Sequence, residues 1–152
     1  MLIRTHIAIS ALFVILFLGS VSNPWLFIPV ALFATILPDI DSGFSTIGRF
    51  QASRFIQFFS KHRGMFHSFS LCIIISVILA AFIPVLALPF FLGYSIHLLA
   101  DCFTVEGVKV FWPFPIKSNW RVRTGSRTES TIFLVFLLAD VLVLLLVIRG
   151  ML

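Results

Sequence analysis

Apolar runs of helical length fill most of this sequence and limit the folds that it can adopt. Of its 152 residues, 60% are hydrophobic and only 11% are charged, whereas about 25% of residues are charged in a typical soluble domain. A bilayer core of ~30 Å needs about 20 helical residues per span. The chain therefore has room for four or five spans and little else. We expect an all-α integral membrane protein whose residues 1–152 form a single transmembrane helical domain.

The expected spans follow the apolar runs. They are residues 7–19, 25–37, 69–83, 90–103 and 131–148. Pro84 and Pro89 are expected to bracket a short turn between the third and fourth spans. A cleaved signal peptide is the alternative for residues 1–22, because Ser20-Val21-Ser22 loosely resembles a small-residue cleavage site.

Two longer polar segments separate the spans, at residues 39–68 and 104–130. Within the first, residues 44–61 place aromatic and charged side chains on opposite sides of a helical wheel, which favours an amphipathic helix in the membrane interface. An ordinary loop is the alternative. In the second, alternating residues at 108–112 and 120–123 permit a small β-hairpin.

The basic residues are distributed unevenly between the two faces of the expected bundle. With five spans, ten of the eleven Lys and Arg residues fall on one side and only Arg149 falls on the other. The positive-inside rule then predicts a multi-pass inner-membrane protein with a cytoplasmic N-terminus. The pI near 10.0 is explained by contact with anionic lipid headgroups, and a nucleic-acid partner is not expected. Cys72 and Cys102 lie in apolar stretches without metal-site spacing and are interpreted as packing residues.

His97 and Asp101 stand out at the end of the fourth apolar run. A separation of four residues places both on the same helix face, which also carries Tyr94 and Thr104. An imidazole and a carboxylate in so apolar a setting are costly unless something satisfies them. The simplest interpretation is a His–Asp hydrogen bond that joins two helix turns.

Further histidines and aspartates are expected at the same membrane face, and together they favour a metal site. The candidate ligands are His6, Asp39, Asp41, His62, His67, His97 and Asp101. Seven ligands exceed the set of one catalytic zinc ion, so two or three ions, most plausibly zinc, are expected. Such ions can clamp the attacking and leaving oxygens in phosphoester hydrolysis. A polar network with the basic residues is the alternative; it explains the aspartates well and the histidines poorly, because neutral histidine is a weak partner for a cation.

Three more ionisable residues, which are not among the seven candidate ligands, are considered for a structural or functional role. Arg63 can hold a phosphate through two hydrogen bonds, with a lipid-facing cation as the equal alternative. Glu129 is assigned first to a capping box with Ser126, and its alternative is a metal-binding or general-base role. Asp140 lies alone in mid-membrane, and no partner for it is indicated.

The sequence resembles the YdjM-like family of membrane-bound proteins named as metal-dependent hydrolases. The resemblance is carried in order by Thr5-His6 with Ser10, Leu37-Pro38-Asp39-Ile40-Asp41, His62-Arg63-Gly64 with His67-Ser68, Gly93-Tyr94, His97-Leu98-Leu99-Ala100-Asp101, Thr104 with Gly107, Trp112-Pro113, and Gly125 with Glu129. Phe66 and Val105 stand where Thr and Pro are expected, and neither position is a candidate ligand. The family is in turn distantly similar to zinc-dependent phospholipases C and single-strand-specific zinc nucleases. This likeness implies metal-ligand roles for His97 and Asp101.

These observations lead to one main functional hypothesis and one alternative. We expect a hydrolase for a phospholipid or another amphiphilic phosphoester, with its metal site at the cytoplasmic interface. The alternative is a membrane protein that binds or transports metal without hydrolysis. Transport would favour ionisable ligands near mid-membrane, where only Asp140 lies. The sequence pattern points to no particular oligomeric state.

Overall fold

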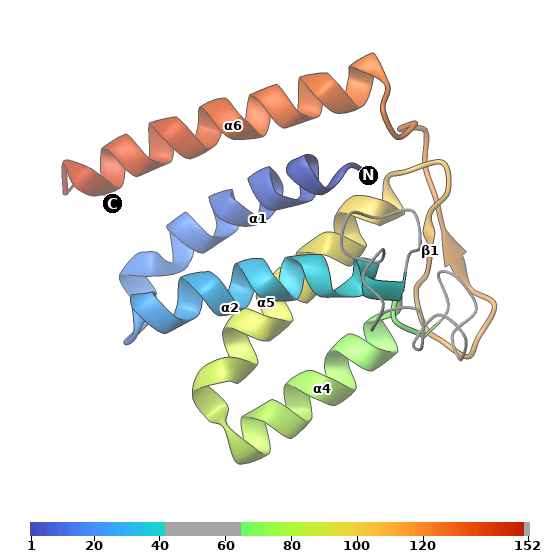
Figure 1. The fold of residues 1–152 in the computed structure, drawn as a ribbon, viewed down its shortest axis with the longest axis horizontal. Coiled ribbons are helices and arrows are strands. Elements are labelled where there is room, and N and C mark those ends of the chain that lie inside the picture. Colours follow the sequence, from blue (N-terminus) through green and yellow to red (C-terminus); the bar gives the residue numbers. More distant parts are fainter. Residues whose placement is uncertain (42–64, 151–152) are drawn as a thin grey trace.

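The computed structural model of the protein describes residues 1–41 and 65–150, and this part of the chain is a helical bundle (Figure 1). Its α-helices are α1 (Ile3–Phe17), α2 (Pro24–Ile36), α4 (Phe69–Phe82), α5 (Pro84–Cys102) and α6 (Arg127–Ile148). Short 3-10 turns, η1 (Leu18–Ser20) and η2 (Leu37–Asp41), continue α1 and α2. The all-α membrane fold is thereby confirmed. The amphipathic helix expected at residues 44–61 lies outside the described residues.

The helices differ in how well their lengths match a bilayer. Among the described residues, three apolar helices are long enough to cross: Ile3–Ser20, which includes η1, together with α5 and α6. The shorter apolar helices are Pro24–Asp39, which includes part of η2, and α4; they extend only about 20–25 Å, against a hydrocarbon core of about 30 Å. The starts of α1, α4 and α6 and the ends of α2 and α5 all lie at one end of the bundle (Figure 1).

Side-chain caps begin three of these helices. The side chains of Asn23, Ser68 and Ser126 each accept a hydrogen bond from a backbone N–H in the first turn of α2, α4 and α6, respectively. Each cap satisfies one of the N–H groups that a helix start leaves without an intrahelical partner. The predicted cap at Ser126 is thus confirmed.

The expected turn between Pro84 and Pro89 is wrong, because α5 begins at Pro84 and contains Pro89 in its interior. Proline is well suited to the first turn of a helix, where its missing N–H would have no intrahelical partner. Spanning helices also tolerate an interior proline, because neighbouring groups compensate for the lost hydrogen bond. The fourth helix therefore starts six residues earlier than the sequence predicted.

Helices α2 and α5 form the centre of the bundle, and Gly93 allows their close approach. A Cβ atom at this position would lie 2.0 Å from the carbonyl oxygen of Ala31. Apolar side chains pack on both sides of the crossing, with Tyr94 and Leu98 fully buried on one side and Phe27 buried on the other. This close crossing brings the end of α2 against the last two turns of α5.

A hairpin connects α5 to α6. It lies beside the end of the bundle where α5 ends and α6 begins (Figure 1). Strand β1 (Val108–Lys109) pairs antiparallel with β2 (Lys117–Ser118). The predicted hairpin exists, but the second strand precedes the expected residues 120–123. In that segment Val122 instead forms an isolated parallel bridge with Thr104, a register that alternation in the sequence does not reveal.

Candidate metal centre

Five of the seven predicted ligands converge at the end of the bundle where the hairpin lies. We call them the His–Asp cluster: His6 from α1, Asp39 from η2, His67 from the segment before α4, and His97 and Asp101 from α5. The side chains are almost fully buried, except that Asp39 is 17% exposed. The side chains of the other two predicted ligands, Asp41 and His62, lie outside the described part, as does Arg63.

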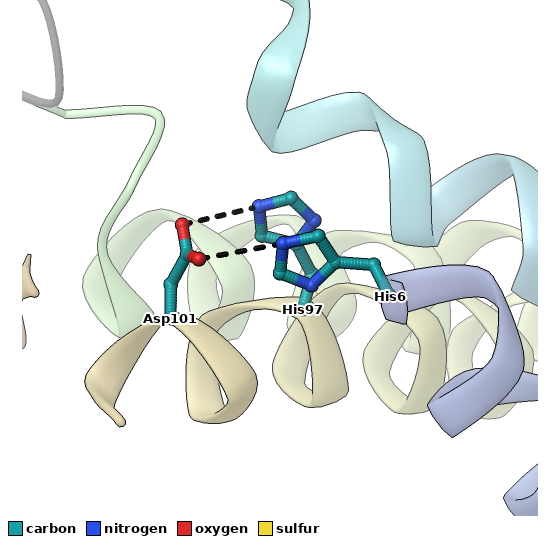
Figure 2. Close-up of side chains that lie close together, drawn as sticks. All are labelled: His6, His97 and Asp101. Atoms are coloured by element: carbon teal, nitrogen blue, oxygen red, sulfur yellow. Dashed lines mark ion pairs between the residues drawn. The ribbon is translucent and has the colours of Figure 1, made fainter. Parts of the chain in front are cut away.

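The Asp101 carboxylate lies between the histidines of the His–Asp cluster. Its Oδ1 atom is 3.3 Å from Nε2 of His6, and the pair is drawn with His97 in Figure 2. Its Oδ2 atom is 3.8 Å from Nε2 of His97 and 3.9 Å from Nε2 of His67. The two oxygens of the carboxylate thus face different histidines, as those of a bridging ligand do, and the closest partner of Oδ1 is the N-terminal ammonium of Met1, 2.6 Å away.

Asp39 completes the other side of the His–Asp cluster. Its Oδ1 atom lies 3.5 Å from Nε2 of His67 and 3.9 Å from Nε2 of His97. Burial raises the pKa of the Asp39 carboxyl, but its hydrogen bond with His67 and its electrostatic interactions with the neighbouring histidines lower it by more, so the pKa lies below its usual value. Asp39 is therefore a carboxylate, the form that ligates metals.

A backbone carbonyl of α2 fixes the orientation of the His97 ring. Nδ1 of His97 lies 2.7 Å from the carbonyl oxygen of Thr35. This oxygen belongs to the last turn of α2, where carbonyls have no intrahelical partner. Because a carbonyl can only accept, Nδ1 carries the proton, and Nε2 of the neutral ring presents a lone pair to Asp39 and Asp101. Metal-binding histidines are commonly held by a hydrogen bond of this kind from the second ring nitrogen.

The buried nitrogens of the His–Asp cluster are donors of the kind that could hold a metal ion. Among the described residues, Nδ1 of His6 has no hydrogen-bond partner, Nε2 of His6 faces Asp101 at 3.3 Å, and Nε2 of His97 lies no closer than 3.8 Å to a carboxylate oxygen. The two rings stack 3.9 Å apart with an interplanar angle of 11°. Two ligands of a tetrahedral zinc ion, each bonded at about 2.0–2.2 Å, lie about 3.3–3.6 Å from each other. The nitrogen–oxygen distances of 3.3 and 3.5 Å match that separation.

The donor atoms form two overlapping groups that could each hold an ion. One contains His6, His97 and Asp101, and the other contains Asp39, His67 and His97. Within each group, the ligand atoms lie within 4.8 Å of one another. Since these are the nitrogen and oxygen donors that zinc prefers, the residues present fit a zinc-type centre.

Two buried residues of the surrounding shell support the His–Asp cluster. The Tyr94 hydroxyl donates to the carbonyl of Phe66 and so fixes the segment that carries His67. The Thr35 hydroxyl lies 2.8 Å from Oγ of Ser10 and so links α2 to α1. The spacing of residues in the sequence predicts Tyr94 on the face of His97 but gives no such indication for Thr35. Its only signal was a small polar residue in the last turn of an apolar run.

Glu129 is buried and joins the start of α6 to the start of α1. Its two carboxylate oxygens accept hydrogen bonds from the backbone N–H groups of Leu2 and Gly125. Its own N–H donates to the Ser126 side chain, which is one half of the predicted capping box; the other half is absent, because the Ser126 N–H donates to the carbonyl of Arg123. Asp140 lies farther along α6, and its Oδ1 atom has no hydrogen-bond partner among the described residues.

Comparison with known proteins identifies relatives among inner membrane proteins. The family model described as "YdjM inner membrane protein" matches residues 1–151. The inner membrane protein YdjM of Escherichia coli (strain K12) is 35% identical over 116 residues, which cover 65% of this chain and 53% of the relative. The protein of the same name from Shigella flexneri matches to the same extent. The match thus spans about half the length of these curated relatives.

No solved structure matches the chain. The family match runs over nearly the whole sequence, and the helices that could span a membrane agree with a membrane location. The chain belongs to the YdjM inner membrane protein family.

Proposed function

We propose that this protein is a membrane-bound metal-dependent hydrolase that cleaves a phosphoester at a zinc-type centre. The observation that carries the proposal is the position of Asp101, whose two carboxylate oxygens face His6 on one side and His67 and His97 on the other. A carboxylate bridging two ions is typical of centres that hold the attacking and leaving oxygens of a phosphoester.

The shared histidine limits how the ions are held. His97 belongs to both candidate groups, but only Nε2 has a free lone pair, because Nδ1 is bonded to Thr35. One lone pair serves one ion, so a second ion would be left with the other two donors of its group and an oxygen of the bridging Asp101, and further donors would complete its shell. Asp41 and His62, the remaining predicted ligands, are the proposed source, which gives a centre of two or three ions.

The residues of the chain would bind and orient the substrate. When bound, divalent ions would supply charge stabilisation for the oxygens of the reacting phosphate. Arg63 is proposed to hold the phosphate through two hydrogen bonds. Asp39 is the most exposed member of the His–Asp cluster, so the substrate phosphate would enter on its side. A site at the end of the spanning helices suits a phospholipid or another amphiphilic phosphoester that arrives within the membrane plane.

The same end of the bundle is proposed to face the cytoplasm. Arg4 near the start of α1, Arg127 at the start of α6 and the lysines of the hairpin lie at this end, whereas Arg149 follows the end of α6. A bias of this size sets the orientation of small membrane proteins. It supports a cytoplasmic location for the N-terminus and the His–Asp cluster.

Turnover measured with defined metal loading tests the proposal. The purified protein would be stripped with a chelator, reloaded with zinc, and assayed on bis(4-nitrophenyl) phosphate and on phosphatidylglycerol vesicles. We expect activity in the zinc-loaded wild type, none after stripping, and a loss of at least about 100-fold in Asp101→Asn. Asp140→Asn, which changes a carboxylate outside the cluster, should keep its activity.

Two results would contradict the hydrolase. Zinc bound in stoichiometric amounts without turnover of either phosphoester would favour the metal-binding or transport alternative. Full activity in Asp101→Asn would place the chemistry elsewhere in the chain.

A further inference from the structure

The hairpin between α5 and α6 has an exposed aromatic tip. The backbone N–H of Val110 donates to the carbonyl of Ile116 and closes the loop behind the tip. Phe111, Trp112 and Phe114 within the loop are all exposed, the last by 62%. Aromatic side chains of this kind are enriched at the headgroup level of membranes.

A pair of lysines lies directly behind this tip. Lys109 and Lys117 are opposite each other in the register of β1 and β2. Both are exposed, whereas Val108 on the other face of β1 is 1% exposed and packs toward the bundle. Among the described residues, neither lysine takes part in an ion pair. Like charges directly across a β-ladder repel each other, so the pair favours an anion between the two ammonium groups.

Backbone hydrogen bonds attach the hairpin firmly to the bundle. The N–H of Phe69, the first residue of α4, donates to the carbonyl of Val110. The N–H of Trp120 donates to the carbonyl of Thr104, just after α5. The tip and the lysine pair therefore keep a fixed position relative to the spanning helices, and the surface is formed before any ligand binds.

The position of the hairpin identifies the ligand. It connects the end of α5 to the start of α6, two helices that are long enough to span a membrane. The hairpin lies at the end of the bundle where α1 and α6 begin (Figure 1), which corresponds to the headgroup level of a membrane that these helices span. We propose that the aromatic tip enters the headgroup layer and that Lys109 and Lys117 together bind the phosphate of an anionic phospholipid. This proposal does not depend on hydrolysis or on bound metal.

The three tryptophans of the chain provide reporters for a direct test. In Trp25→Phe, the remaining reporters are Trp112 in the tip and Trp120 beside it. The protein would be placed in vesicles of equal parts phosphatidylcholine and phosphatidylglycerol, with bromine on the acyl chains of one lipid at a time. We expect stronger quenching when phosphatidylglycerol carries the bromine, with a local enrichment of about fivefold or more. Lys109→Gln combined with Lys117→Gln should remove this difference.

Two matched controls separate the lysine pair from the general positive charge of the surface. The first combines Arg121→Gln with Arg123→Gln, which removes the same charge outside the two strands and should preserve the lipid preference. The second uses Trp25 as the only reporter; it is 88% exposed in the first turn of α2, at the other end of the bundle, and should show no preference.

Three outcomes would overturn the proposal. The first is equal quenching by the two brominated lipids in the Trp25→Phe protein. The second is a preference that persists in the double lysine variant. The third is a loss of preference in the double arginine variant as large as that in the lysine variant, which would assign the effect to the surface charge as a whole.

Discussion

Replacing Gly93 by alanine should push α2 and α5 apart and weaken the metal centre without changing any ligand. A Cβ atom at position 93 would lie 2.0 Å from the carbonyl oxygen of Ala31 and 3.1 Å from the backbone nitrogen of Thr35. Since real Cβ contacts are essentially never shorter than 3.0 Å, the helices must separate by at least about 1 Å. The obstructing atoms belong to the backbone, so no side-chain rotation relieves the clash.

This displacement has two measurable costs. Overpacking of a close helix crossing costs about 1–3 kcal/mol of unfolding free energy. The hydrogen bond between Nδ1 of His97 and the Thr35 carbonyl is 2.7 Å long in the structure. A shift of about 1 Å would stretch it past the usual length of a hydrogen bond, and its weakening would cost about 1 kcal/mol more of unfolding free energy. Loss of the group that orients a metal-binding histidine typically lowers metal affinity by about 10–100-fold.

Thermal unfolding in detergent and competition with a fluorescent zinc chelator would measure the two effects. The matched control is Gly19→Ala in η1, where an added Cβ atom meets no heavy atom within 4 Å. The control should behave as wild type in both assays. A Gly93→Ala protein with unchanged stability and zinc affinity would refute the role assigned to the crossing.

Three further substitutions test the shell of the site and the membrane-embedded carboxyl. Tyr94→Phe removes the donor to the Phe66 carbonyl and should lower zinc affinity about tenfold in the chelator assay; unchanged affinity would show that this hydrogen bond does not position the cluster. Glu129→Gln should lower the free energy of unfolding by about 1–3 kcal/mol, because an amide oxygen replaces a carboxylate that accepts two backbone hydrogen bonds. The number of bound zinc ions, measured by elemental analysis, should not change, and zinc loss in a folded protein would instead make Glu129 a ligand. Asp140→Leu should raise the unfolding midpoint, with a gain of about 1–3 kcal/mol, because it removes a carboxyl oxygen that has no hydrogen-bond partner among the described residues; a lower midpoint would show that Asp140 has a stabilising partner.

The helices could be predicted from the sequence because the bilayer imposes long apolar runs and because their ends carry local signals. The side chains of Asn23 and Ser126 each accept a hydrogen bond from the N–H of the residue three positions later, so a short stretch of sequence is enough to recognise such a cap. Pro84 and Pro89 were misassigned because proline is compatible both with a turn and with the first turns of a spanning helix. Only the packing of α5 decides between these two possibilities.

The convergence of the residues of the His–Asp cluster could be predicted, because an alternation of spans brings successive helix ends to the same face. The order of the helices along the chain is enough to predict that His6, His67 and His97 lie close together. The role of Thr35 could not be predicted, because it depends on how closely α2 approaches α5. The hydrogen bond between Glu129 and Leu2 could not be predicted either, because Leu2 is 127 positions away in the sequence and no local pattern links the two residues.

The metal content of the purified protein tests the central claim most directly. Wild-type protein in detergent would be equilibrated with zinc, freed of unbound metal by gel filtration, and analysed beside a protein carrying His97→Ala and Asp101→Ala, with circular dichroism to compare helix content. The account predicts at least one zinc ion per wild-type chain and none in the equally helical double variant. A metal-free wild type, or a double variant that keeps its zinc, would contradict it.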